Sequence, residues 1–201
     1  MNNEFIIENG VLLEYKGNDE KVIIPNSVKK IGLGVFNHCD DLKEIVISES
    51  VMGVGESAFS WCKNLKKVVL KDGLKKIDKF AFDNCGDLKK VVVPKSVKLI
   101  GNGAFHWCDS LKKVLLNDGL EEIEDGAFSW CIELKEVVIP KSVRIIRKKI
   151  FAGCGNLKKV VIENPNVDID KDAFWGCDEL KKIIIGDRTL SIDELYDLTR
   201  K

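Results

Sequence analysis

Seven cysteines and two histidines are the side chains of this 201-residue sequence that metal, redox or nucleophilic chemistry would use. No two cysteines form a C-x-x-C motif, and their interval of 23 residues matches no common zinc-binding spacing. An odd number of thiols also leaves one without a disulfide partner. The cysteines occupy one position of a repeat: Cys39, Cys62, Cys85, Cys108, Cys131, Cys154 and Cys177. We interpret them as small buried core residues, with a metal or redox role as the alternative.

The histidines, His38 and His106, lie in different repeats and are offset by one position. Neither is accompanied by a recurrent serine or aspartate constellation, and both follow shortly after a repeated phenylalanine, which indicates ordinary surface positions. The sequence contains no P-loop, no G-x-G-x-x-G fingerprint and no H-E-x-x-H motif. It therefore predicts a protein that is not an enzyme, with no catalytic residue, no cofactor and no metal site.

Three apolar columns share the 23-residue step of the cysteines. The first is Phe36, Phe59, Phe82, Phe105, Phe128, Phe151 and Phe174. The second is Leu42, Leu65, Leu88, Leu111, Leu134, Leu157 and Leu180. The third is Ile31, Val54, Ile77, Ile100, Ile123, Ile146 and Ile169, and it continues to Ile192. Self-similarity at such a period is the signature of a solenoid, in which stacked coils together bury what one coil cannot.

One coil shows how the chain turns. Residues 88–93 are rich in β-branched side chains and end at Pro94, which predicts a short strand followed by a corner. Residues 101–107 predict one tight helical turn that carries Ala104 and Phe105 into the core. The expected fold is an α/β solenoid. Its right-handed coils of about 23 residues would place one parallel β-sheet on one face and short helical turns opposite.

The sequence predicts a single solenoid over residues 1–201, with both ends sealed. Residues 1–19 favour a β-hairpin cap with Asn9 and Gly10 at its turn. Residues 20–185 hold seven coils. Residues 186–201 favour a helical cap, because Ser191 and Glu194 have the spacing of a capping box. Atypical sequences at both ends lead us to expect a complete array.

The repeat, C-x-x-L-K-x-V-x-I-P-x-S-V-x-x-I-G-x-x-A-F, resembles the BspA-like, or Treponema pallidum, class of leucine-rich repeats. The resemblance covers about residues 20–190, and the N-G-V-L-L-x-Y stretch before it is similar to the cap that often precedes these repeats. It implies a non-catalytic module that adheres to proteins, of a kind common on bacterial and protist surfaces. No catalytic residues are known for these repeats, so the resemblance implies none here.

Charge and composition narrow the classes of partner. Lys+Arg and Asp+Glu both total 32, so no whole-molecule field draws the chain to nucleic acid or to an anionic membrane. Only four basic residues are arginine, which leaves few bidentate groups for specific nucleic-acid recognition. No run of 18 apolar residues predicts a membrane span, and no secretory signal is visible at the N-terminus. As the sequence stands it predicts a cytoplasmic monomer, whereas the resembled family is often exported.

A protein ligand on the sheet face is the leading hypothesis for partner binding. Strand alternation sends one wholly apolar column outward: Val46, Val69, Val92, Leu115, Val138, Val161 and Ile184. We expect the ligand to make its water-excluding apolar contacts with Val69, Val92, Leu115 and Val138. A polar rim beside them would be formed by Lys67, Lys90 and Lys113. The alternative interpretation of the column is that β-branched residues simply suit an exposed strand ladder.

Other surfaces carry rival hypotheses. Every coil has a lysine beside the strand, which predicts either a polyanion or glycan site or a solvated edge: Lys43, Lys66, Lys89, Lys112, Lys135, Lys158 and Lys181. A structural spacer within an assembly is a further possibility. Stacking also predicts ion pairs between coils, Glu121 with Lys98 and Arg144, Glu124 with Arg147, and Asp125 with Lys148. Four tryptophans are either partner anchors or rings packed on a neighbouring coil: Trp61, Trp107, Trp130 and Trp175.

Overall fold

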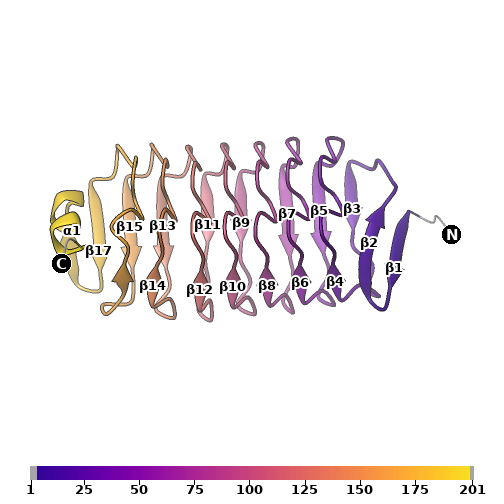
Figure 1. Ribbon diagram of the computed structural model, residues 1–201, viewed down its shortest axis with the longest axis horizontal. Coiled ribbons are helices and arrows are strands. Elements are labelled where there is room, and N and C mark those ends of the chain that lie inside the picture. Colours follow the sequence, from indigo (N-terminus) through magenta and orange to yellow (C-terminus); the bar gives the residue numbers. More distant parts are fainter. Residues whose placement is uncertain (1–3, 200–201) are drawn as a thin grey trace.

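The computed structural model describes residues 4–199 as an elongated stack of coils, running from a hairpin at the N-terminal end to a helix at the C-terminal end (Figure 1). One side of the stack, the long-strand face, carries one parallel strand from each of eight coils. These strands are β3 (Lys21–Ile23), β5 (Glu44–Ile47), β7 (Lys67–Leu70), β9 (Lys90–Val92), β11 (Lys113–Leu115), β13 (Glu136–Ile139), β15 (Lys159–Ile162) and β17 (Lys182–Ile185). The register advances by one repeat per coil, as in the pair Ile45 and Val68, so each sequence column becomes a physical row.

Hydrogen bonding divides the long-strand face into three sheets rather than the single sheet predicted. They have the orders β3-β5-β7, β9-β11 and β13-β15-β17-β18, where β18 spans Arg188–Leu190. Within each sheet the parallel strands stay in register, for example Val92 with Leu115 and Val138 with Val161. The strand predicted over residues 88–93 is confirmed as β9.

A second side of the solenoid carries short parallel strands that the sequence analysis missed. They are β4 (Lys30–Ile31), β6 (Gly53–Val54), β8 (Lys76–Ile77), β10 (Leu99–Ile100), β12 (Glu122–Ile123), β14 (Ile145–Ile146) and β16 (Asp168–Ile169). The first five continue the hairpin in one seven-stranded sheet, and β14 pairs with β16. Two residues per strand are too few for a periodic pattern to be recognised.

The third side, the turn face, corrects the expectation of helical turns. In the described chain, residues 101–107 form consecutive turns and no helix. Backbone donors alternate there between two partners. The Ala104 N–H donates to Gly101 within the coil, over 3.1 Å, and the Phe105 N–H donates to Ala127 of the next coil, over 2.8 Å. Because the neighbouring coil takes every second donor, the run of i to i−4 bonds that defines an α-helix does not form.

One residue in each coil of the turn face adopts a left-handed backbone conformation. This position directly precedes the repeated cysteine and has φ between 53° and 72°: His38, Trp61, Asn84, Trp107, Trp130, Gly153 and Gly176. A second such column also mixes glycine with larger residues: Gly34, Ser57, Phe80, Gly103, Gly126 and Lys149. A side chain at positive φ is strained, whereas glycine is not. The array thus keeps its backbone conformation even where the residue type opposes it.

Replacing Lys149 by glycine is therefore expected to stabilise the protein, by up to about 1 kcal/mol. Lys149 has φ 57° and an exposed side chain, and glycine already occupies the equivalent positions Gly103 and Gly126. The free energy of unfolding from urea titration measures the effect. Lys148→Gly, at an exposed neighbour without positive φ, is the control and should not stabilise the protein. A loss of stability in Lys149→Gly would contradict the strain argument.

Stacked rings and thiols fill the core. The seven phenylalanines of the repeat are buried and lie parallel, with centroid distances from 4.9 Å at Phe36 and Phe59 to 5.8 Å at Phe151 and Phe174. Tyr15 and Phe5 of the hairpin extend this stack at 5.0 and 5.1 Å. The aromatic column therefore links the N-terminal hairpin to the repeats.

The cysteines occupy the core, as predicted, and also make a hydrogen bond that the sequence did not reveal. Each thiol from Cys62 onward donates to the carbonyl of the phenylalanine 26 residues earlier, over 2.9 to 3.2 Å. Cys39 is only half-buried and lies outside this series. All seven are free thiols. Across residues 4–199, no group of three or more His, Cys, Asp or Glu side chains is arranged to hold a metal ion.

Different elements close the two ends. The hairpin β1 (Phe5–Glu8) and β2 (Val11–Tyr15) joins the short-strand sheet through β4. At the other end β18 pairs antiparallel with β17, and α1 (Ile192–Thr199) follows. Ser191 caps this helix, since its hydroxyl accepts the Glu194 N–H and its own N–H donates to the Glu194 carboxylate. The division at residues 19 and 185 stays a prediction, and residues 1–3 and 200–201 lie outside the described chain.

Candidate protein-binding surface

Among its seven predicted positions, the outward apolar column of the long-strand face is most exposed at the centre. Val92, Leu115 and Val138 have 40%, 38% and 45% of their surface exposed, whereas Val69 is half-buried. Between them the inward residues, such as Val91, are buried, so the strands alternate as predicted. Ile23 of β3 extends the same column and is 59% exposed. The sequence prediction did not include Ile23, because it covered only the repeats that contain a cysteine. Ile23 nevertheless lies 23 residues before Val46 and so belongs to the same column.

The predicted lysine rim divides into a paired and an unpaired part. Glu44 forms ion pairs with Lys67 at 3.1 Å and with Lys21 at 3.3 Å. The bond from Lys67, followed by that from Lys21, lowers the pKa of the Glu44 carboxyl group. Lys90 and Lys113 are register partners on β9 and β11, and no ion pair is found for either within residues 4–199. Their charges are therefore available to a ligand.

We define the central patch as Val92, Leu115 and Val138 together with Lys90 and Lys113. Its residues project outward from β9, β11 and β13, which lie side by side in the middle of the stack (Figure 1). The patch combines a stripe of apolar side chains with two lysine ammonium groups one coil apart. Such a surface suits a protein ligand with apolar side chains next to acidic ones.

The lysine column beside the strands is exposed in all seven coils, and parts of it are paired. Lys43 forms an ion pair with Glu20, and Lys181 with Glu179 at 3.8 Å. Among exposed side chains such pairs contribute little to stability. These contacts fit the interpretation of a solvated edge. A polyanion site at the other five lysines stays a prediction.

The predicted ion-pair ladder is confirmed at one step and wrong at another. Lys98 and Glu121 pair at 2.8 Å as expected. Arg147, however, pairs with Glu122 at 2.5 Å instead of Glu124. The carboxylate of Glu124 instead accepts the Asn102 backbone N–H at 2.8 Å. Within residues 4–199 no ion pair joins Asp125 to Lys148 or Glu121 to Arg144.

His106 has a polar partner that the sequence interpretation missed. Its Nδ1 lies 2.8 Å from the Asp83 carboxylate, and Asp83 precedes it by one repeat. Ser129 follows His106 by one repeat, but its hydroxyl donates to the Gly126 carbonyl at 2.9 Å. Shifting the sequence by 23 residues would have placed all three in one row. His38 is exposed and stacks on the Trp61 ring at 5.6 Å.

The packing interpretation of the tryptophans is confirmed for Trp130, and their role as partner anchors stays a prediction. The Trp130 ring lies against Gly153 of the next coil so closely that a Cβ there would come within 2.6 Å of it. Its other surface is open, because 42% of the residue is exposed, and Trp175 is 57% exposed. The rings are thus supported by the adjoining coil and still present a face to solvent.

The parallel strands, the in-register columns and the leucine- and phenylalanine-filled core define a leucine-rich-repeat solenoid. The BspA type leucine rich repeat region matches the sequence in six copies over residues 9–98 and 75–196, and the chain belongs to this family. The resemblance stated from the repeat pattern is therefore confirmed. Repeats of this kind are typical of surface and protein-interaction proteins and are generally non-catalytic.

Three solved structures are similar to the chain, and the first agrees with this assignment. A T. pallidum leucine rich repeat protein is 32% identical with a TM-score of 0.81, over 85% of this chain and 82% of its own. A leucine-rich repeat protein from Bacteroides capillosus is 26% identical, over 53% and 86%, with a TM-score of 0.49. A leucine rich cell surface protein from Faecalibacterium prausnitzii is 20% identical, over 91% and 87%, with a TM-score of 0.48. No curated protein matches the chain.

The helix α1 has eight residues. No helix in the described part of the chain has the length and apolar character needed to cross a bilayer.

Proposed function

We propose that this protein is a non-catalytic interaction or adhesion module that binds a protein ligand on its long-strand face. The observation that carries the proposal is the exposed apolar stripe at Val92, Leu115 and Val138, which lies in one row across three coils. Isolated exposed apolar residues are common on protein surfaces, whereas a contiguous row is typical of an interface.

The stack also supports binding by its rigidity. The strands under the patch are held by buried residues such as Val91, Val114 and Val137. β9 pairs with β11 and β13 pairs with β15, whereas β11 and β13 belong to separate sheets and are joined through the buried core. Little conformational entropy is then lost when a ligand docks. Lys90 and Lys113 next to the stripe favour a ligand whose apolar contact is flanked by Asp or Glu.

The double variant Val92→Asp, Leu115→Asp tests this proposal. Two new charges in the apolar stripe should weaken ligand binding at least about thirtyfold, since each apolar contact at an interface centre contributes on the order of 1–2 kcal/mol. Because both side chains project outward, the free energy of unfolding should change by less than about 1 kcal/mol per site. The ligand would first be isolated with wild-type protein from cell extract, and its affinity for each variant then measured by calorimetry.

Ile145→Asp provides the matched control. Ile145 is 44% exposed, like the patch residues, but lies on β14 of the short-strand side. This variant should bind the ligand as wild type does. Equal binding by the double variant with its fold intact would show that the long-strand face is not the site.

A further inference from the structure

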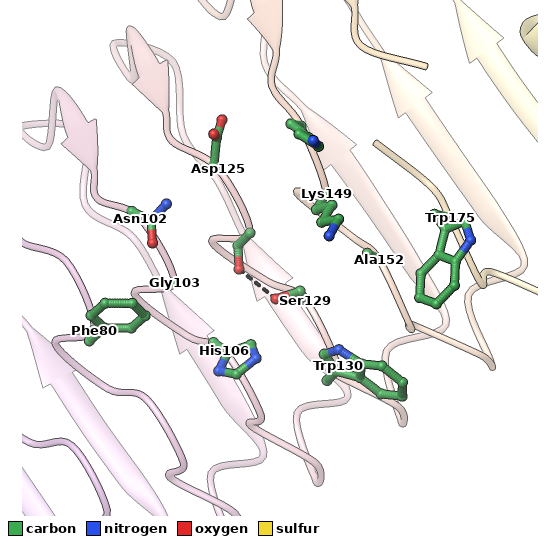
Figure 2. Close-up of a pocket in the computed structure, with 12 residues that line it drawn as sticks. Phe80, Asn102, Gly103, His106, Asp125, Ser129, Trp130, Lys149, Ala152 and Trp175 are labelled. Carbon is green, nitrogen blue, oxygen red and sulfur yellow. Dashed lines mark hydrogen bonds between the residues drawn. The ribbon is translucent and has the colours of Figure 1, made fainter. Parts of the chain in front are cut away.

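The turn face contains a hollow of about 460 Å³ that lies on a different side from the central patch (Figure 2). Its lining comes from five successive coils, from Phe80 at one end to Trp175 at the other. A volume of this size falls within the range of small-ligand sites. The central patch contributes no residue to it.

Small residues in the middle of two columns create the hollow. Gly103 and Gly126 stand between Phe80 and Lys149 in one column, and Ala152 precedes Trp175 in another. Both glycines have positive φ, so the backbone favours the absence of a side chain there. The hollow therefore follows from the sequence, because consecutive coils lack large side chains at these positions.

Aromatic rings form the walls, and two of them, Phe80 and Trp130, pack on glycines of the neighbouring coils. The Phe80 ring lies against Gly103, where a Cβ would come within 2.5 Å of it, as the Trp130 ring lies against Gly153. Phe80, Trp130 and Trp175 nevertheless remain 37%, 42% and 57% exposed. Flat apolar faces fixed around an open hollow can stack on a ring-shaped ligand without further ordering.

The polar groups of the hollow favour a negative charge. Lys148 and Lys149 are both exposed, and neither forms an ion pair within residues 4–199. Asp125 is the acidic residue of the lining, and the Asp83 carboxylate contacts His106, so the attraction for an anion is local to the two lysines. His106 adds a ring nitrogen, since its Nδ1 is held by Asp83 and its Nε2 is left for other contacts. Figure 2 shows Asp125 and Lys149 across the hollow from His106 and Trp130.

We propose that this hollow binds a pyranose that carries a carboxylate, as one or two units of an acidic glycan. The C–H faces of the sugar ring would stack on Trp130 or Trp175, as aliphatic faces do on indole. The carboxylate would lie against Lys148 and Lys149. The ring hydroxyls would bond to His106, and to the amide of Asn102 on the same lining. This site is separate from the proposed protein-binding face, and either can fail without the other.

Calorimetric titration with defined sugars tests the proposal. Digalacturonate represents the hexuronic acids and N-acetylneuraminate the sialic acids, and maltose is the neutral comparison. At least one acidic sugar should bind ten or more times tighter than maltose, and rising salt should weaken it because the lysine–carboxylate attraction is screened. The acidic sugar that binds identifies the source of the carboxylate. If neither binds more tightly than maltose, the proposal is overturned.

Variants connect the binding to the hollow. Lys149→Gly removes a cation at a position whose backbone suits glycine, and should weaken acidic-sugar binding about tenfold. Trp130→Gly should weaken it by a similar factor or more. Trp61→Gly is the matched control, because Trp61 occupies the same column three coils earlier, has a φ of 62° and lies outside the lining. Equal losses in the two tryptophan variants, with both still folded by circular dichroism, would overturn the assignment of the site.

Discussion

Replacing Phe105 by alanine should lower the free energy of unfolding by about 3–5 kcal/mol. The ring is fully buried and lies between Phe82 and Phe128 at centroid distances of 5.2 and 5.3 Å. Its loss leaves a cavity at the centre of the column, where neither neighbour can move without disturbing its own coil. Because each coil is stabilised mainly by its neighbours, the defect should also weaken the coupling between the two halves of the array.

Urea unfolding followed by circular dichroism measures both effects. The midpoint should fall, and the transition should broaden or divide as the halves unfold separately. Phe80→Ala is the control, since Phe80 is a 37% exposed ring on the turn face and its removal should cost no more than about 1 kcal/mol. Similar losses at both sites would contradict the role assigned to the stacked column.

Raising the pH above 9 should destabilise the protein steeply. Burial raises the pKa of five core thiols well above the ordinary value of 9.0: Cys62, Cys85, Cys108, Cys131 and Cys177. In the unfolded chain these thiols ionise near pH 9, whereas in the fold they remain protonated. The stability contributed by the neutral thiols is thus complete below pH 9 and is lost as the pH rises towards the folded pKa values.

The expected loss is large because the thiols act together. Each one costs about 1.4 kcal/mol by one pH unit above its unfolded pKa, so five cost about 7 kcal/mol at pH 10, which is comparable to the stability of a whole domain. Burial also raises the pKa of Tyr15 to about 12, which extends the loss above pH 10. Urea titrations at pH 7, 8, 9 and 10 measure the trend. Cys108→Ala should reduce the loss by about one fifth; an unchanged slope in that variant would refute the thiol explanation.

The two proposed sites give the solenoid separate surfaces for different ligands. The central patch on β9, β11 and β13 is apolar with a lysine rim, and the hollow on the turn face is aromatic with an exposed lysine pair. Both arise from the same rule, that a residue type repeated or omitted every 23 positions becomes a row on the surface. A repeat array can therefore change one surface by substitution without altering the core that supports the other.

The sequence alone determined the coil length, the residues of the core and the outward direction of Val92, Leu115 and Val138. The coil length and the core follow from periodicity, because stacked coils bury the repeated apolar residues together, and the outward direction follows from strand alternation. Family membership followed from the same columns. The capping box at Ser191 was also predictable, since it depends on contacts only three residues apart.

The tertiary structure decided what depends on competition between coils. The helical turn over residues 101–107 does not form because donors such as the Phe105 N–H bond to the next coil. Arg147 pairs with Glu122, while the Glu124 carboxylate accepts the Asn102 backbone N–H. The hollow between Phe80 and Trp175 exists only once five coils are stacked. Each outcome depends on which of several nearby groups satisfies a given donor or fills a given space, and that choice is settled by three-dimensional packing rather than by the order of residues.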